Sequence, residues 1–218
     1  MKKKVNKSTK KLLIIIAVII GFFALGFLVR FVYNPTGAAV TIDELHKKNL
    51  EGEESNINYV YNGFSFVYVD NLWYTQVQRP DGTLLDVPLH FGPRDLEDIP
   101  AIGNINDQFK QPRIYITFDP NDRSLKFVAL SSAELSLNLA KGLEILPIAA
   151  CAKNETEACG NRPIVTCEDN DKAVIYLKQT DSTGIVRLEG NCIELKGEGW
   201  ELVKATDRLL LQWYQVMK

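Results

Sequence analysis

The sequence contains few of the residues, and none of the short motifs, by which enzyme active sites are usually recognised. Among its 218 residues are only two histidines, His46 and His90. The patterns G-x-S-x-G, G-x-x-x-x-G-K-[ST], H-E-x-x-H and G-x-G-x-x-G are all absent. Their absence removes the common signatures of serine hydrolases, P-loop proteins, zinc proteases and dinucleotide-binding enzymes. The sequence therefore favours a non-enzymatic role, assigns no catalytic residue and predicts no cofactor.

Acidic residues are absent from the first part of the chain, up to Asp43. Residues 1–11 contain six lysines, and residues 12–29 contain no charged side chain. A helix of that apolar length spans about 27 Å, which is close to the hydrocarbon thickness of a bilayer. Arg30 and two aromatic residues follow, and such residues suit the membrane interface. We therefore expect a transmembrane anchor over residues 12–33, with the lipid bilayer as its partner.

The lysines decide the expected orientation, because positively charged flanks stay in the cytoplasm. Residues 1–11 should form a basic cytoplasmic tail, and the C-terminal domain should be extracytoplasmic. The chain would then be a single-pass protein of the cell membrane. A cleaved signal peptide is the alternative, although its apolar core would be about 7 to 15 residues long. That alternative would place the cleavage site within residues 34–40.

The remainder of the chain lacks an excess of positive charge. Residues 34–218 hold 18 of the 25 Lys and Arg residues and all 27 Asp and Glu residues, which gives a net charge of −9. Nucleic acids bind proteins through basic faces, so the sequence argues against a nucleic-acid partner. A protein or another component of the cell envelope is the expected partner.

The four cysteines follow the spacing C-x7-C-x7-C-x24-C, without a C-x-x-C pair. An even number of cysteines in an extracytoplasmic domain is typical of disulfides. Three pairings exist, and we expect Cys151–Cys159, which closes a polar loop, and Cys167–Cys192, which ties two predicted strands. The histidines lie far away in sequence, so no metal site is expected. Asn154 begins an Asn-Glu-Thr triplet in the first loop and is a glycosylation candidate.

Residue patterning predicts an α+β ectodomain in which antiparallel strands pack with two main helices. A stalk or linker over residues 34–56, with a short helix beginning at Thr41, should precede an ectodomain over residues 57–218. That ectodomain could comprise two lobes, 57–112 and 113–218. Strands rich in aromatic and β-branched residues are expected within residues 57–69, 72–78, 84–91, 113–130 and 173–197.

Three local signals refine this prediction. Asn62-Gly63 in the middle of the first β stretch favours a hairpin, because both residues tolerate positive φ. Ser131 and Glu134 form a capping box, which predicts a helix beginning there. Residues 200–217 show the spacing of an amphipathic helix whose apolar face packs against a sheet.

Candidates for acid–base chemistry are few. His90 follows a predicted strand, and Asp95 or Asp98 could orient it as a base. Asp119 and Asp122 are further carboxylates that a hydrolase could use. The simpler interpretation is that His90 lies at the surface and that the two later aspartates form a turn, since Asp side chains bond their own backbone.

Three stretches of the ectodomain bear on its relationships. They are PRDLEDIP (93–100), PIVTCEDNDKAVIYLK (163–178) and GNCIELKGEGWELVKATDRLLLQWY (190–214). Together with the earlier cysteines, these stretches resemble small membrane-anchored proteins of uncharacterised function from archaea. The resemblance covers most of the ectodomain. It implies a cell-envelope setting and confers no activity and no catalytic residue.

The sequence thus supports three hypotheses. The first is a membrane-anchored cell-envelope protein whose ectodomain is a binding or structural module. The second is an extracytoplasmic hydrolase that uses carboxylates, with Glu97 added to the aspartates named above. The third is a thiol oxidoreductase, which would need a reactive cysteine. The missing catalytic motifs and the missing C-x-x-C pair favour the first hypothesis.

Overall fold

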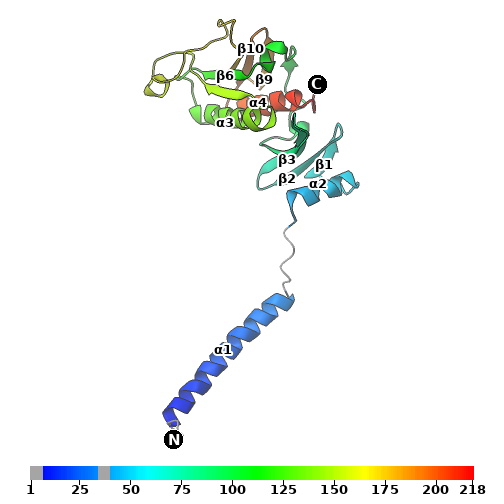
Figure 1. Ribbon diagram of the computed structural model, residues 1–218, viewed down its shortest axis with the longest axis vertical. Helices are drawn as coiled ribbons and strands as arrows, with labels where there is room; N and C mark the ends of the chain where they lie inside the picture. Colours follow the sequence, from blue (N-terminus) through cyan, green and yellow to red (C-terminus); the bar gives the residue numbers. More distant parts are fainter. Residues whose placement is uncertain (1–6, 34–39) are drawn as a thin grey trace. The chain divides into compact units, whose positions relative to one another are not determined.

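The computed structural model of the protein describes residues 7–33 and 40–218 (Figure 1). Residues 1–6 of the predicted cytoplasmic tail and residues 34–39 of the predicted stalk lie outside the described residues. The chain divides into two compact units, Met1–Thr41 and Ile42–Lys218.

Helix α1 (Lys7–Tyr33) belongs to the first unit. It forms because its sequence is rich in Leu, Ile and Phe and has no proline to interrupt the hydrogen bonds between successive turns. Between Leu13 and Leu28 its large apolar side chains are exposed, and those of Phe22 and Phe27 reach 76% and 73%. In the part of the chain that the structure describes, no helix has both the length and the apolar character needed to cross a membrane. The anchor over residues 12–33 stays a prediction.

The second unit starts with helix α2 (Ile42–Leu50) and a four-stranded antiparallel sheet. The strands are β1 (Asn58–Tyr61), β2 (Phe64–Val69), β3 (Leu72–Gln78) and β4 (Leu84–Leu89), in that order. Asn62 and Gly63 join β1 to β2 with φ values of 49° and 86°. Positive φ at both positions is what a type I′ hairpin requires, so the predicted hairpin is confirmed.

Helix α2 corrects the prediction that residues 42–50 belong to a stalk. The helix packs on β1 and β2 and buries His46 and Asn49. Nδ1 of His46 lies 2.8 Å from the Ser65 hydroxyl, and Asn49 Nδ2 donates to the Phe66 carbonyl at 2.9 Å. Burial lowers the pKa of His46. The polar composition suggested a linker. However, these side chains form hydrogen bonds with β2, and those bonds offset the free-energy cost of burying polar groups.

The rest of the chain builds a six-stranded sheet and two long helices. In chain order the elements are η1 (Pro93–Asp95), β5 (Ala101–Ile102), η2 (Asp107–Lys110), β6 (Arg113–Phe118), α3 (Leu125–Gly142), β7 (Leu146–Ala149), η3 (Glu157–Cys159), β8 (Val174–Gln179), β9 (Ile185–Glu189), β10 (Cys192–Gly197) and α4 (Trp200–Trp213). The strand order is β5-β9-β10-β8-β6-β7. Strand β9 is antiparallel to β10, whereas the other neighbours in this sheet are parallel.

Two expectations for this part need correction. Antiparallel pairing describes the first sheet, but the second sheet is mixed, because α3 returns the chain so that β7 runs parallel to β6. The second strand expected within residues 113–130 does not form, because helix α3 begins at Leu125. Ser131 and Glu134 therefore lie inside the helix and are buried, and neither caps it.

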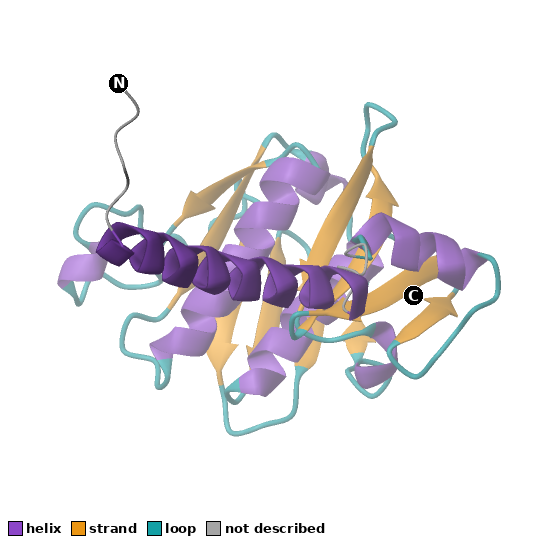
Figure 2. Ribbon diagram, turned by 90° about the horizontal axis from the view of Figure 1, so that it is seen from below, coloured by secondary structure: helices purple, strands orange, loops and turns teal. Residues whose placement is uncertain are grey.

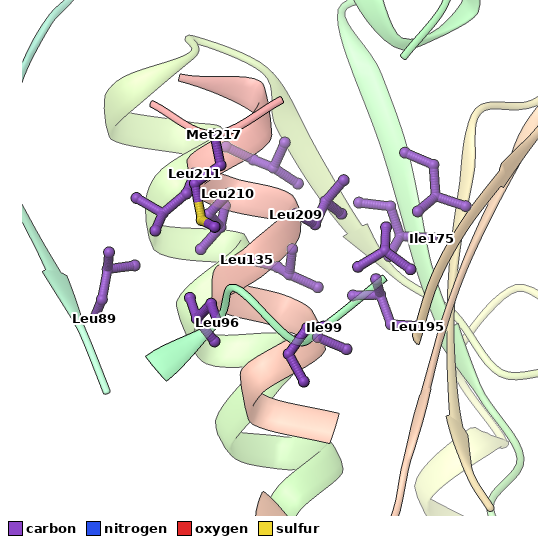
Figure 3. Packing of buried hydrophobic residues seen from close by; sticks show 14 of the residues in the cluster. Leu89, Leu96, Ile99, Leu135, Ile175, Leu195, Leu209, Leu210, Leu211 and Met217 are labelled. Atoms are coloured by element: carbon purple, nitrogen blue, oxygen red, sulfur yellow. The ribbon is translucent and has the colours of Figure 1, made fainter. Parts of the chain in front are cut away.

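Helices α3 and α4 pack against each other and lie between the two sheets (Figures 1 and 3). Figure 2 shows the helices and strands of the chain from below. In Figure 3, Leu89 of β4 lies on one side of the helix pair, and Ile175 and Leu195 of the six-stranded sheet lie on the other. Leu135 of α3 and Leu209 of α4 are fully buried between them. Full burial of such a side chain contributes roughly 1.5–3 kcal/mol. The predicted α+β class with two main helices is confirmed for this unit.

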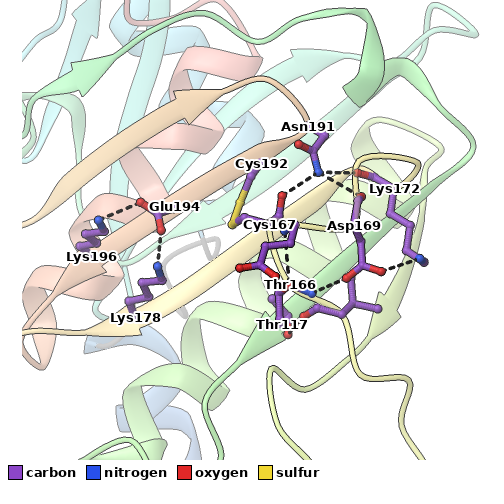
Figure 4. The surroundings of a disulfide bond; sticks show 12 residues. Thr117, Thr166, Cys167, Asp169, Lys172, Lys178, Asn191, Cys192, Glu194 and Lys196 are labelled. Carbon is purple, nitrogen blue, oxygen red and sulfur yellow. Dashed lines mark hydrogen bonds and ion pairs between the residues drawn. A yellow bond between two sulfur atoms is a disulfide. The ribbon is translucent and has the colours of Figure 1, made fainter.

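The face of the six-stranded sheet that points away from the helices is partly covered by the cysteine segment. Disulfide Cys151–Cys159 closes the loop after β7, and Cys167–Cys192 joins the segment before β8 to the first residue of β10. These are the pairs expected from the spacing. Asn191 Nδ2 donates to the carbonyls of Cys167 and Asp169 at 3.3 and 3.1 Å, which fixes the same segment (Figure 4).

We predict that the two disulfides stabilise the fold unequally. Their sequence separations are 8 and 25 residues, for which loop-closure entropy gives about 2.6 and 3.5 kcal/mol. Replacing Cys167 and Cys192 together by serine should therefore lower the free energy of unfolding more than replacing Cys151 and Cys159. Denaturant titration of the full chain measures both losses. An inverted order would contradict the loop-closure account.

Candidate functional site

The acidic residues near His90 in sequence do not form a site with it. Asp95 Oδ2 accepts a hydrogen bond from the Gly92 N–H at 3.2 Å, at the start of η1. Asp98 is exposed on the following loop, and Glu97 hydrogen bonds to Tyr61. The predicted role of Asp95 or Asp98 in orienting His90 is therefore corrected, because both carboxylates are directed to other surroundings.

Asp119 and Asp122 lie together after the carboxyl end of β6. Asp119 pairs with Lys153 at 2.7 Å, and this contact together with the Asn121 N–H lowers its pKa. Asp122 accepts from the Gln179 N–H at 3.3 Å, and burial raises its pKa. The bond from Asn121 N–H to the Asp119 side chain is the local turn contact expected of Asp. The turn interpretation is confirmed for these residues.

His90 contacts an acidic residue that is distant in sequence. Its Nδ1 lies in hydrogen-bond contact with Glu134 Oε1 of helix α3. The Glu134 side chain is 9% exposed and the His90 side chain 25%, so the carboxylate is enclosed while the imidazole reaches the surface. The contact arises where the end of β4 approaches α3.

Asp207 of helix α4 completes this cluster and is fully buried. Its Oδ2 accepts from the Phe91 N–H at 2.8 Å, and the Glu134 carboxyl group lies beside it. Burial raises the pKa of Glu134 to about 7. Burial, reinforced by the neighbouring Glu134 carboxylate, raises the pKa of Asp207 well above its usual value. Two carboxyl groups in such contact retain a shared proton.

Aromatic side chains border the cluster. The Trp200 ring lies 5.7 Å from the His90 ring, 5.9 Å from Phe91 and 5.3 Å from Phe127. Trp200 itself is 49% exposed. The chemistry available here is proton uptake and release near neutral pH. The same three groups tie β4 to α3 and α4, so the cluster also holds the two sheets around the helix pair.

Sequence reasoning missed Glu134 and Asp207 for different reasons. Glu134 looked like part of a capping box. Asp207 lies one helical turn from both Val203 and Leu211, which are fully buried. Asp207 therefore lies on the apolar face of an amphipathic helix, where an acidic residue is unusual. That position could have identified Asp207 as a buried acid from the sequence.

A groove of about 560 Å³ lies elsewhere on the helix pair, between α3, the end of β6 and the loop that Cys151–Cys159 closes. Small ligands occupy sites of roughly 300–1,000 Å³. Helix α3 supplies one wall with small or apolar side chains: Leu125, Val128, Ala129, Ser132, Ala133 and Ser136. Phe118 of β6 lies opposite, and Thr156, Ala158 and Arg162 form the wall next to the disulfide.

The polar groups of the groove are few, and two of them, Thr156 and Arg162, lie on the wall next to the disulfide. The Thr156 hydroxyl is buried and has no hydrogen-bond partner among the described residues. The Arg162 guanidinium carbon lies 5.8 Å from the centre of the Phe118 ring. Arg162 is exposed and forms no ion pair with any acid in residues 40–218. Asn154, the glycosylation candidate, is exposed on the same loop.

Neither metal ligation nor similarity assigns a function to these sites. Among the described ranges, no group of three or more His, Cys, Asp and Glu side chains is arranged to hold a metal ion. No protein-family model, no curated protein and no solved structure matches the chain. The groove and the carboxyl–imidazole cluster therefore have to be interpreted from their geometry.

The raised pKa of Glu134 predicts that stability depends on pH. Its pKa is about 7 in the folded chain, against an ordinary value of 4.5. The stability that protonated Glu134 contributes to the folded chain is therefore fully present below pH 4.5 and is lost as the pH rises through 7. We expect Glu134→Gln, which stays neutral and can still accept from His90, to be more stable than the natural chain at pH 8, by on the order of 2–3 kcal/mol.

Thermal unfolding of the full chain between pH 5 and pH 8 measures this difference. Glu198→Gln, at an exposed position on the loop before α4, is the control and should leave the pH profile unchanged. The lowered pKa of His46 acts in the opposite direction, because its contribution is lost on acidification below about pH 6.5. If the unfolding temperatures of the natural chain and of Glu134→Gln changed with pH in the same way, Glu134 would not be the group responsible for the pH dependence.

Proposed function

We propose that this protein is anchored in a membrane by its first helix and that its extracytoplasmic domain is a binding module, with the groove beside α3 as the binding surface. The observation that carries the proposal is the groove itself. It combines a volume in the range of ligand sites with an apolar lining and a few polar groups at one wall. Binding sites of folded domains have this composition.

The anchor is supported by the sequence and by the exposure of α1. Residues 12–29 carry no charge, and the six lysines before them favour an N-terminus in the cytoplasm. The exposed side chains between Leu13 and Leu28 are almost entirely apolar. Such a surface needs an apolar environment, because exposed apolar area of this extent is unfavourable in water. A cell-membrane location with the domain outside the cytoplasm follows.

Binding is favoured over catalysis by where the reactive groups lie. All four cysteines are in disulfides, so no thiol is present to act as a nucleophile. The carboxylates suggested by the sequence are divided between the η1 region and the end of β6. The cluster of His90, Glu134 and Asp207 is compact, but its carboxyl groups are enclosed. A substrate would therefore reach only the imidazole.

Site-specific photocrosslinking tests the binding surface. Leu125 and Leu137 both lie on α3 with exposed side chains, but Leu125 lines the groove and Leu137 does not. We expect Leu125→p-benzoylphenylalanine to form a light-dependent adduct in intact membranes of cells that express the full chain. Leu137→p-benzoylphenylalanine is the matched control and should form none. Equal adducts, or no adduct at Leu125, would contradict the proposed binding surface.

The orientation has a separate test in the Asn154 triplet. When the full chain is expressed in a cell that glycosylates its secreted proteins, we expect added mass on the loop between Cys151 and Cys159. Asn154→Gln should abolish that added mass, and the chain should still sediment with membranes after alkaline extraction. A chain that is released by alkaline extraction would contradict the anchor, and an unmodified Asn154 would contradict the orientation.

A further inference from the structure

We infer that the groove beside α3 binds a single-chain amphiphile with an anionic end, specifically a long-chain fatty acid. The inference rests on the proposed function, because it assigns a ligand class to the same groove. It draws on two features of the structure: the apolar lining and the cation at one wall.

The lining fits an alkyl chain. Ala129, Ala133 and Ala158 leave space where larger side chains would fill it, and Phe118 and Val128 supply apolar contact. Each methylene group that such a lining takes from water contributes roughly 0.8 kcal/mol. A volume of about 560 Å³ suits one chain. A two-chain phospholipid would leave much of its apolar surface in water.

The wall next to the Cys151–Cys159 disulfide provides the groups that recognise an anionic end. Arg162 brings a positive charge that no acid among the described residues pairs with, and it is held near the Phe118 ring. The buried Thr156 hydroxyl lacks a partner and lines the same wall. A carboxylate placed there would accept a charge-assisted hydrogen bond from the guanidinium and a further bond from the hydroxyl. The Cys151–Cys159 disulfide holds this wall beside α3.

The position of the protein makes such a ligand available. The bilayer in which the first helix is proposed to lie is a source of fatty acids. The domain as a whole is acidic, with a net charge of −9 over residues 34–218. Attraction of an anion therefore depends on the local charge of Arg162 rather than on the overall field.

Photolabelling with a diazirine derivative of dodecanoic acid tests the inference on the full chain in phosphatidylcholine nanodiscs. Trypsin releases residues 127–141 of α3 as one peptide, since Lys126 and Lys141 border it. We expect label on this peptide. Ala133→Trp, which fills the groove, should remove the label, and Leu137→Trp, on the same helix outside the groove, should retain it. Label on residues 12–30 reports contact with the bilayer and serves as an internal control.

Arg162→Gln tests the anionic end without altering a buried residue. We expect the concentration of unlabelled dodecanoate needed for half displacement to rise roughly fivefold, as loss of one exposed charge-assisted bond implies. Arg162→Lys should restore most of the affinity. Dodecanol, which lacks the charge, should displace the probe less well than dodecanoate and be insensitive to Arg162→Gln.

Two results would overturn the inference. The first is that the photolabel is found only on residues 12–30, or that the label on the α3 peptide is unchanged by Ala133→Trp. The second is that dodecanol and dodecanoate displace the probe equally well. Failure of the proposed function is distinguishable. A protein-sized adduct at Leu125→p-benzoylphenylalanine would keep the binding surface and reject the fatty acid, whereas no adduct would reject the surface as well.

Discussion

The second unit, Ile42–Lys218, depends on the burial of helix α3 between its neighbours. Leu135 and Leu139 are fully buried against α4 and the six-stranded sheet. Around the same helix, Glu134 points to the end of β4, and Ala129 and Ala133 line the groove. The core, the carboxyl–imidazole cluster and the candidate binding surface therefore share one element. A change that shifts α3 should affect all three together, because packed interiors transmit displacement.

The two polar features of the molecule differ in their surroundings and so in their roles. His90, Glu134 and Asp207 are joined to one another and to the backbone of Phe91, so their hydrogen bonds are largely internal. Such a network specifies how β4 sits on the helices. In the groove, the Thr156 hydroxyl has no hydrogen-bond partner among the described residues, and Arg162 contacts the Phe118 ring but pairs with no acid among them. Unsatisfied groups beside an apolar lining are what a ligand would complete.

The sequence predicted local features better than long-range ones. The Asn62-Gly63 hairpin, strands β3 and β4 and the C-terminal helix followed from turn chemistry and periodicity, which act over a few residues. The mixed pairing of the second sheet depends on the path of α3 and could not be read from strand composition. Neither could the cluster, because His90 and Glu134 are separated by 44 residues and Asp207 by more. The groove is made from α3, β6 and a disulfide loop, and none of these segments carries a motif.

The alanine methyl groups of the groove give the most direct test of the central claim, that this surface takes up an apolar ligand. In the full chain with ¹³C-labelled alanine methyls in nanodiscs, addition of dodecanoate should shift the resonances of Ala129, Ala133 and Ala158. Ala205 of α4, which is fully buried in the core, should stay unchanged. Shifts confined to Ala17 and Ala24 of α1, or no shifts at all, would contradict the account.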